Sequence, residues 1–231
     1  TISPACMLDG QQDRVRSIDW NSDGSLIAAG YQRGALILWE VDTGRAKAKY
    51  QLPEDEVLGV RWAPDGRRLA FGNGKDLYVM DVSEPGNPPE AIGRETDMFV
   101  ITSIQWGPDG SHVFAGNWWQ SLGGLWNVDQ GERVRDIPGW FVRFQADGQD
   151  VELWISSDAT GEMQVWDDTQ QRQRKTLIGH RAAVRSLAWS PNGQSLLSAS
   201  FDRSLRVWDA TNFNVLDLLP GHPDQVWDAR W

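Results

Sequence analysis

A short turn signature that recurs along the chain constrains its fold more than any other feature. An Asp or Asn followed by Gly forms a tight turn, because the first side chain bonds its own backbone and Gly tolerates a positive φ. A pattern that returns roughly every 40 residues is typical of repeat architectures, in which each repeat is one supersecondary unit. The pairs are Asp23-Gly24, Asp65-Gly66, Asp109-Gly110, Asp147-Gly148 and Asn192-Gly193.

The residues around each turn indicate β-strands. An aromatic residue precedes every pair, and a run that ends in a bulky residue and usually an acid follows it. The clearest copy spans Gly179 to Asp209: a first strand reaches Trp189, a second covers Ser195 to Ser200, and a third ends in Trp208-Asp209. Three such strands are not stable alone, so neighbouring repeats must pack against them. The aromatics are Trp20, Trp62, Trp106, Phe144 and Trp189, and the later runs end at Glu40, Asp81, Asn127, Asp167 and Asp209.

The clearest copy carries Gly179-His180, Asp202 and Trp208-Asp209 in the order typical of one family. Over nearly all of its length, the chain resembles the WD-repeat family of β-propellers. The resemblance implies an all-β fold, a β-propeller of four-stranded antiparallel blades. Five full blades are visible, and the expectation is that they are part of a seven-bladed propeller.

The repeats divide the whole chain as a single WD-repeat region. Residues 1–13 are expected to be the outer strand of a split blade, and residues 222–231 to start a further, incomplete repeat, with a first strand from Gln225 to Trp231. Closure across a gap and completion by another chain are the alternatives to a longer propeller. The full repeats are expected at 14–55, 56–97, 98–139, 140–179 and 180–221.

Composition restricts the partners and the compartment. The formal net charge of -10 argues against nucleic acid and anionic membrane surfaces. No apolar run reaches the roughly 18 residues of a membrane span. The one cysteine, Cys6, excludes an internal disulfide framework and favours the cytoplasm. The periplasm is the alternative, because the second repeat, with Pro64-Asp65-Gly66 and Leu77 to Asp81, also resembles the Tol-type periplasmic propellers.

The resemblance to WD repeats implies a buried hydrogen-bonded tetrad in the clearest copy. Its members would be His180, Ser198 or alternatively Ser200, Asp202 and Trp208. A buried indole N–H and a buried carboxylate both need partners, which gives the set a physical reason. His222 could start a second tetrad, whose other members would lie beyond Trp231.

Two chemical readings compete with these structural ones. Ser198, His180 and Asp202 could form a hydrolase triad, but no Gly-x-Ser-x-Gly elbow surrounds any serine. The Asp-Gly turns could bind calcium, but no EF-hand pattern is present. The sequence therefore predicts no catalytic residue, no metal site and no cofactor.

Two adjacent tryptophans, Trp118 and Trp119, stand in a long connection between predicted strands of the third repeat. Packing hides both less easily than one, because adjacent strand residues point to opposite sides. The alternative is that one indole fills a blade interface. In WD-repeat propellers such turns gather at one rim, and aromatic, Met and Arg residues are enriched at interface centres. The predicted partner-binding rim combines Trp118, Trp119, Met98, Trp140, Arg181, Phe201 and Arg203.

These observations predict a non-catalytic scaffold that binds a protein or peptide at the rim. A sensor or regulatory part of a larger multidomain protein, in contact with its other domains, is one form of this role. The alternative is a propeller enzyme or small-ligand binder that uses the mouth of the central channel. No convergent set of catalytic acids, bases or metal ligands with a known spacing favours that alternative.

Overall fold

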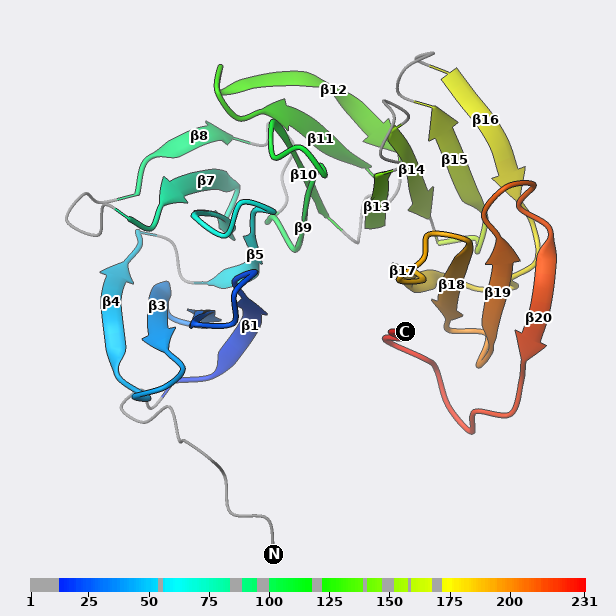
Figure 1. Cartoon of the computed structure of the whole chain (residues 1–231), viewed down its shortest axis with the longest axis horizontal. Helices are drawn as coiled ribbons and strands as arrows, with labels where there is room; N and C mark the ends of the chain where they lie inside the picture. The colour runs from blue at the N-terminus through cyan, green and yellow to red at the C-terminus, as the bar shows by residue number, and fades with distance from the viewer. Residues whose placement is uncertain are drawn as a thin grey trace, which may run out of the picture. The chain divides into compact units, whose positions relative to one another are not determined.

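The computed structural model describes residues 13–53, 56–83, 89–94, 100–117, 122–138, 141–146, 152–157, 159–167 and 172–231. The chain divides into two compact units, one of Thr1–Asn117 with Gly124–Arg135 and one of Trp118–Gly123 with Asp136–Trp231. Across these described ranges, twenty strands form five four-stranded sheets, and the regular structure is entirely β (Figure 1). The predicted outer strand at residues 1–13 lies, except for Asp13, outside the described residues.

The first unit contains two complete sheets and most of a third. In each sheet the strands pair in chain order, and the neighbouring strands whose register is described are antiparallel. Each sheet lies within one of the repeat ranges that the sequence predicts. The strands are β1 (Val15–Trp20), β2 (Leu26–Tyr31), β3 (Ala35–Glu40), β4 (Ala46–Gln51), β5 (Val57–Trp62), β6 (Arg68–Asn73), β7 (Asp76–Asp81), β8 (Ala91–Arg94), β9 (Ser103–Trp106), β10 (His112–Asn117), β11 (Leu122–Asn127) and β12 (Glu132–Pro138).

The second unit contains two sheets with the same antiparallel order. The chain after the last strand, drawn in red in Figure 1, returns to the first strand of the final sheet. The basic run Arg172 to Lys175 lies on the fourth strand of its sheet, as the sequence predicts. The strands are β13 (Phe141–Ala146), β14 (Glu152–Ser157), β15 (Met163–Asp167), β16 (Arg172–Leu177), β17 (Val184–Trp189), β18 (Ser195–Ser200), β19 (Leu205–Asp209) and β20 (Val215–Leu219).

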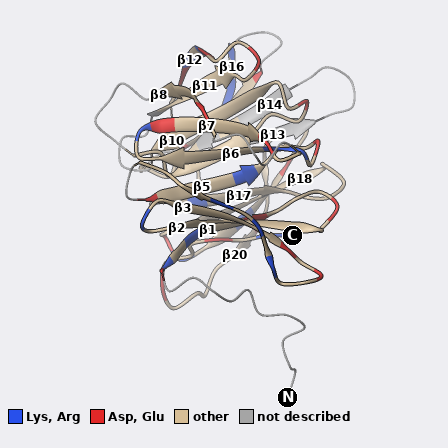
Figure 2. Cartoon of the chain, turned by 90° about the vertical axis from the view of Figure 1, so that its left-hand side faces the viewer, with Lys and Arg blue, Asp and Glu red and all other residues tan. Residues whose placement is uncertain are grey.

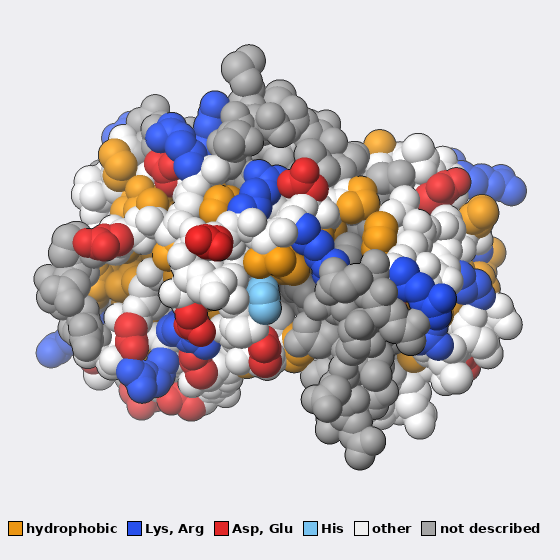
Figure 3. Space-filling view, turned by 90° about the horizontal axis from the view of Figure 1, so that it is seen from above, with side chains coloured by type: hydrophobic (Ala, Val, Ile, Leu, Met, Phe, Trp, Pro, Cys, Tyr) orange, Lys and Arg blue, Asp and Glu red, His pale blue; other side chains and the backbone are white. Residues whose placement is uncertain are grey.

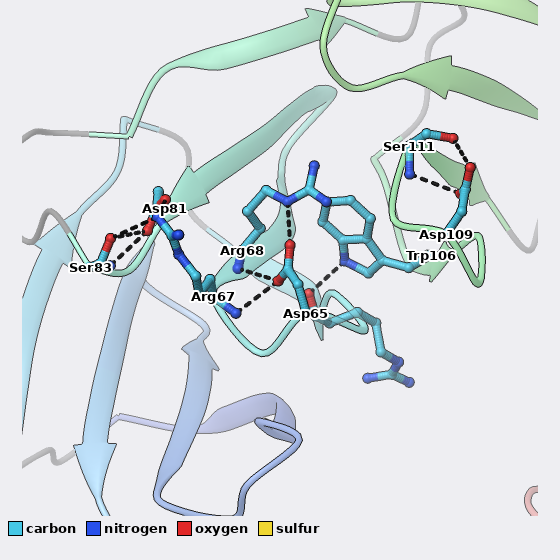
Figure 4. A network of polar contacts seen from close by, with 9 residues as sticks. Asp65, Arg67, Arg68, Asp81, Ser83, Trp106, Asp109 and Ser111 are labelled. Carbon is cyan, nitrogen blue, oxygen red and sulfur yellow. Dashed lines mark hydrogen bonds and ion pairs between the residues drawn. The ribbon is translucent and has the colours of Figure 1, made fainter.

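Within the described residues, the Asp-Gly pairs and Asn192-Gly193 form the turns between the first and second strands, whereas Asp147-Gly148 lies outside them. Asp65 accepts hydrogen bonds from the backbone N–H groups of Arg67 at 2.8 Å and Arg68 at 2.9 Å, and Gly66 has a φ of 68° (Figure 4). That left-handed conformation is why glycine follows the acid. The carboxylate thus accepts hydrogen bonds from the backbone of the turn. The described residues contain no group of three His, Cys, Asp or Glu that could hold a metal ion. The same bond joins Asp23 to Ser25, Asp109 to Ser111 and Asn192 to Gln194.

The core of the first unit lies between successive sheets. Val60 and Trp62 of β5 pack on the first sheet with Leu26 and Leu36, and all four are buried. The approach is so close that a Cβ added at Gly72 of β6 would lie 2.7 Å from Ile101. Ile104 and Trp106 of β9 pack on the second sheet in the same way. Each first strand therefore fills the face of the sheet before it.

The second unit repeats this arrangement. Leu187 of β17 packs with Ile155 of β14, Met163 and Val165 of β15, and Trp208 of β19. In the first unit, Trp20 of β1 is 52% exposed, and the described residues place no sheet on that side of β1. By contrast, Trp62 and Trp106 are buried behind the preceding sheet, and Trp189 of β17 is half-buried.

Charged residues lie mainly in turns and at strand ends, and most strand surface is uncharged (Figure 2). On the face displayed in Figure 3, cations and anions are interspersed among hydrophobic side chains. Among the described residues, no helix has the length and apolarity to cross a membrane.

Candidate functional site

Four residues of the final sheet form a continuous hydrogen-bonded chain. Trp208 donates its indole N–H to Ser198 Oγ at 2.8 Å. Ser198 Oγ lies 2.7 Å from His180 Nε2, and His180 Nδ1 lies 2.8 Å from Asp202 Oδ2. The pattern assigns the proton to Nδ1, which donates to the carboxylate, while Nε2 accepts from the serine hydroxyl. The structure therefore joins the residues that the sequence places in a tetrad, with Ser198 as its serine.

Electrostatics favours a neutral imidazole beside an ionised carboxylate. Burial lowers the pKa of His180, against the opposite effect of Asp202. Burial also acts to raise the pKa of Asp202, but hydrogen bonds from Ser204, the Arg181 backbone and His180 outweigh it and lower this pKa to about 2. Ser204 donates both its hydroxyl, at 2.6 Å, and its N–H, at 3.0 Å, to this carboxylate.

The tetrad is built for structure. Ser198 has 0% exposure, so its hydroxyl cannot meet a substrate from solution. Asp202 also accepts from the Arg181 N–H at 3.0 Å, which ties the turn after β18 to the segment before β17. Ser200, the alternative serine, makes a separate tie, because its hydroxyl donates to the Ala182 carbonyl at 2.8 Å.

The first unit makes the equivalent of the Ser200 tie with asparagine. Asn73 at the end of β6 donates to the Glu56 carbonyl at 3.1 Å, and Asn117 at the end of β10 donates to the Val100 carbonyl at 2.6 Å. Sequence reasoning missed both residues. The signal that could have found them is a polar residue at the last position of the second strand. Three repeats share it, as Asn73, Asn117 and Ser200.

Three segments of the second unit meet beside the tetrad and form what we call the rim surface: residues 181–185, 200–204 and 224–228. Phe201 N–H donates to the Ala183 carbonyl at 2.9 Å, and Val226 N–H donates to the Ser200 carbonyl at 3.2 Å. Arg203 has a φ of 69°, which is unusual for a non-glycine residue and is held by the turn. These bonds fix the backbone from which the rim side chains project.

An arginine lies against a pair of contacting aromatic rings in this surface. The Arg185 guanidinium is 5.3 Å from the Phe201 ring centroid and 5.2 Å from that of Trp227, and the two rings meet edge to face at 4.7 Å. Arg185 occupies a bulge in β17, where the register shifts between Val184 and Ser186. A bulge redirects a side chain and is invisible to strand alternation, so sequence reasoning missed Arg185. Burial lowers the pKa of its guanidinium.

The segment after β20 lies along β17. Trp231 donates its indole N–H to the Ala188 carbonyl at 3.0 Å, as Trp62 does to the Asp19 carbonyl at 3.2 Å in the first unit. Ser186 also donates to Asp228 at 2.5 Å. The sequence predicts a strand from Gln225 to Trp231, but the structure assigns none there. The segment lies as the first strand of a following sheet would, yet it has no second strand to pair with in the described chain.

The predicted rim residues divide into two groups. Arg181, Phe201 and Arg203 lie together on the rim surface, where Arg181 and Arg203 are exposed and Phe201 is half-buried. Trp227, which the sequence analysis did not select, is 57% exposed beside Phe201. Met98, Trp118, Trp119 and Trp140 lie outside the described residues.

Comparison with known families agrees with this geometry. The family model described as "WD domain, G-beta repeat" matches residues 171–209, the span that holds the whole tetrad. The chain is built of WD repeats. A second model, described as the WD40 domain of anaphase-promoting complex subunit 4, matches residues 6–63.

Curated relatives and a solved structure extend the likeness over most of this WD-repeat chain. It is 26% identical to a guanine nucleotide-binding protein subunit beta of Nicotiana tabacum, over 88% of this chain and 58% of the relative. It is 22% identical to the subunit of that name from Oryza sativa subsp. japonica, over 94% of this chain and 61% of the relative. The C-terminal WD40 domain of Sif2 matches with a TM-score of 0.78 and 23% identity, over 93% of this chain and 63% of that one.

These matches confirm the all-β WD-repeat fold of four-stranded antiparallel blades. The chain spans about three-fifths of the length of these relatives, 58% and 61%. The predicted repeat boundaries and the expected total of seven blades stay predictions.

Proposed function

We propose that this WD-repeat chain is a non-catalytic scaffold that binds a protein or peptide through its rim surface. The observation that carries the proposal is the 57% exposed indole of Trp227, held beside Phe201 and Arg185 on backbone that hydrogen bonds tie together. Exposed aromatic and arginine side chains on a rigid base are typical of the centres of protein interfaces.

The relatives support an assembly role, since those compared are named as subunits of guanine nucleotide-binding proteins. The channel-mouth enzyme gains no support from the Ser-His-Asp set, because its serine is fully buried. We also propose a regulatory role within a larger chain. We propose a cytoplasmic location, with the periplasm as the alternative.

Affinity capture from the source extract tests the proposal. The intact chain is compared with a rim variant that combines Arg203→Ala and Trp227→Ala. We expect the intact chain to retain a specific protein that the rim variant loses, because the variant removes the exposed cation and the exposed ring.

A matched control removes the same side-chain types elsewhere. Trp20 is 52% exposed on β1, and Arg172 is exposed on β16, so Trp20→Ala with Arg172→Ala removes one exposed indole and one guanidinium outside the rim surface. Equal thermal unfolding of the variants establishes that folding is unchanged. The proposal fails if the control and the rim variant retain the same proteins in equal amounts.

A further inference from the structure

The rim surface carries two cations that form no ion pair with another described residue. The guanidinium groups of Arg181 and Arg203 are exposed and make no ion pair or hydrogen bond with another described residue. The chain as a whole has a formal net charge of -10. The two arginines therefore give the rim surface a local positive charge on a chain that is acidic overall.

The carboxylates of the rim surface already have partners. Asp202 accepts from His180, the Arg181 backbone, and both donors of Ser204. Asp224 accepts from the Gln225 N–H at 2.7 Å. Asp228 accepts from Ser186 and pairs with Arg230. These carboxylates are therefore engaged with donors other than the guanidinium groups of Arg181 and Arg203.

The backbone segments that carry the two arginines are joined through the carboxylate of Asp202. The Arg181 N–H bonds Asp202, and Arg203 follows Asp202 in a left-handed turn conformation. Trp227 adds an exposed ring, which contacts Phe201 edge to face and lies beside the Arg185 guanidinium. A ligand that suits this surface carries carboxylates for the guanidinium groups and an apolar or aromatic side chain for the indole.

We infer that the rim surface binds an acidic peptide segment, with carboxylates at Arg181 and Arg203 and an apolar or aromatic side chain on Trp227. The inference rests on the proposed scaffold function and names the chemistry of the partner. Single-stranded nucleic acid also offers anions and stacking rings. The peptide is the occupant proposed here, because the relatives compared are named as protein subunits.

Fluorescence anisotropy with a labelled peptide tests the inference. The probe is fluorescein-Glu-Glu-Asp-Phe-Glu-Glu-Asp, and its matched control replaces every Glu by Gln and every Asp by Asn. We expect the acidic probe to bind the intact chain at least tenfold more tightly than the amide probe. Binding should weaken as salt is raised, because exposed charge pairs are screened.

Variants locate the binding. Arg181→Gln with Arg203→Gln should weaken binding of the acidic probe at least threefold, because each exposed charge pair contributes up to about a factor of five. Trp227→Ala should weaken it further. Arg172→Gln with Arg174→Gln removes the same charge from β16 of the same unit and should change binding less than twofold.

Several results would overturn the inference. They are no saturable binding of the acidic probe, equal binding of the amide probe, or equal binding by the intact chain and the double rim variant. Tighter binding of a ten-residue oligothymidine than of the acidic probe would also overturn it and would favour nucleic acid. If the acidic probe does not bind while the capture experiment still shows a partner that the rim variant loses, the proposed scaffold function stands and only the inference of an acidic ligand is wrong. If both fail, the proposed function falls as well.

Discussion

The buried tetrad allows a quantitative prediction for Ser198→Ala. The hydroxyl accepts from the Trp208 indole at 2.8 Å and lies 2.7 Å from His180 Nε2, and the exposures of the three residues are 0%, 2% and 7% for Ser198, Trp208 and His180. Removing it leaves one donor and one acceptor buried without partners. Each such group costs about 1–3 kcal/mol, so we expect the free energy of unfolding to fall by about 2–6 kcal/mol.

Urea unfolding followed by circular dichroism measures this change. The control is Ser195→Ala, at the partly exposed start of the same strand, which should cost less than about 0.5 kcal/mol. Trp208→Phe keeps most of the ring and removes the N–H, so it should cost about 1–2 kcal/mol beyond the packing loss.

The double variant, Ser198→Ala with Trp208→Phe, separates the shared bond from packing. Because one hydrogen bond serves both residues, the two losses should sum to more than the loss of the double variant. A Ser198→Ala loss below about 0.5 kcal/mol, or additive losses in the double variant, would refute the reasoning.

Two further predictions concern pH and close packing. The pKa of Asp202 is lowered to about 2, so its contribution to stability is complete above pH of about 4 and is lost as pH falls toward 2; acid titration of Asp202→Asn should show a shallower loss in this window. The lowered pKa of His180 adds a loss that begins as pH falls below about 6.5, because the unfolded chain binds the proton first. A Cβ at Gly72 would lie 2.7 Å from Ile101, whereas one at Gly59 would lie 3.4 Å from Ile104. Gly72→Ala should therefore lower the unfolding midpoint in urea by clearly more than Gly59→Ala, with a cost of about 1–3 kcal/mol, and equal midpoints would contradict the packing.

Local chemistry explains what the sequence could predict. The turn at Asp65-Gly66 follows from side-chain bonding and a positive φ, both of which depend on neighbouring residues alone. The grouping of His180, Asp202 and Trp208 came from the resemblance of one copy to WD repeats, and hydrogen bonds join these residues in the structure. The choice between Ser198 and Ser200 needed the structure, because both point to the same side of β18.

The arginine-aromatic cluster depends on relations that one repeat does not contain. Arg185 reaches Phe201 and Trp227 from a bulge, and alternation along β17 does not reveal a bulge. Trp227 reaches the same place from the segment after β20, where a strand was predicted and none is assigned. Four of the predicted rim residues, Met98, Trp118, Trp119 and Trp140, lie outside the described residues, so their part in binding stays a prediction.

Site-specific photo-cross-linking tests the central claim, that the rim surface contacts a partner, most directly. A benzophenone side chain replaces Arg203 on the rim surface in one variant and Arg172 on β16 in the other, and both are irradiated in the source extract. We predict that position 203 cross-links to a defined protein and that position 172 does not. Equal cross-linking at both positions, or cross-linking at position 172 alone, would contradict the account.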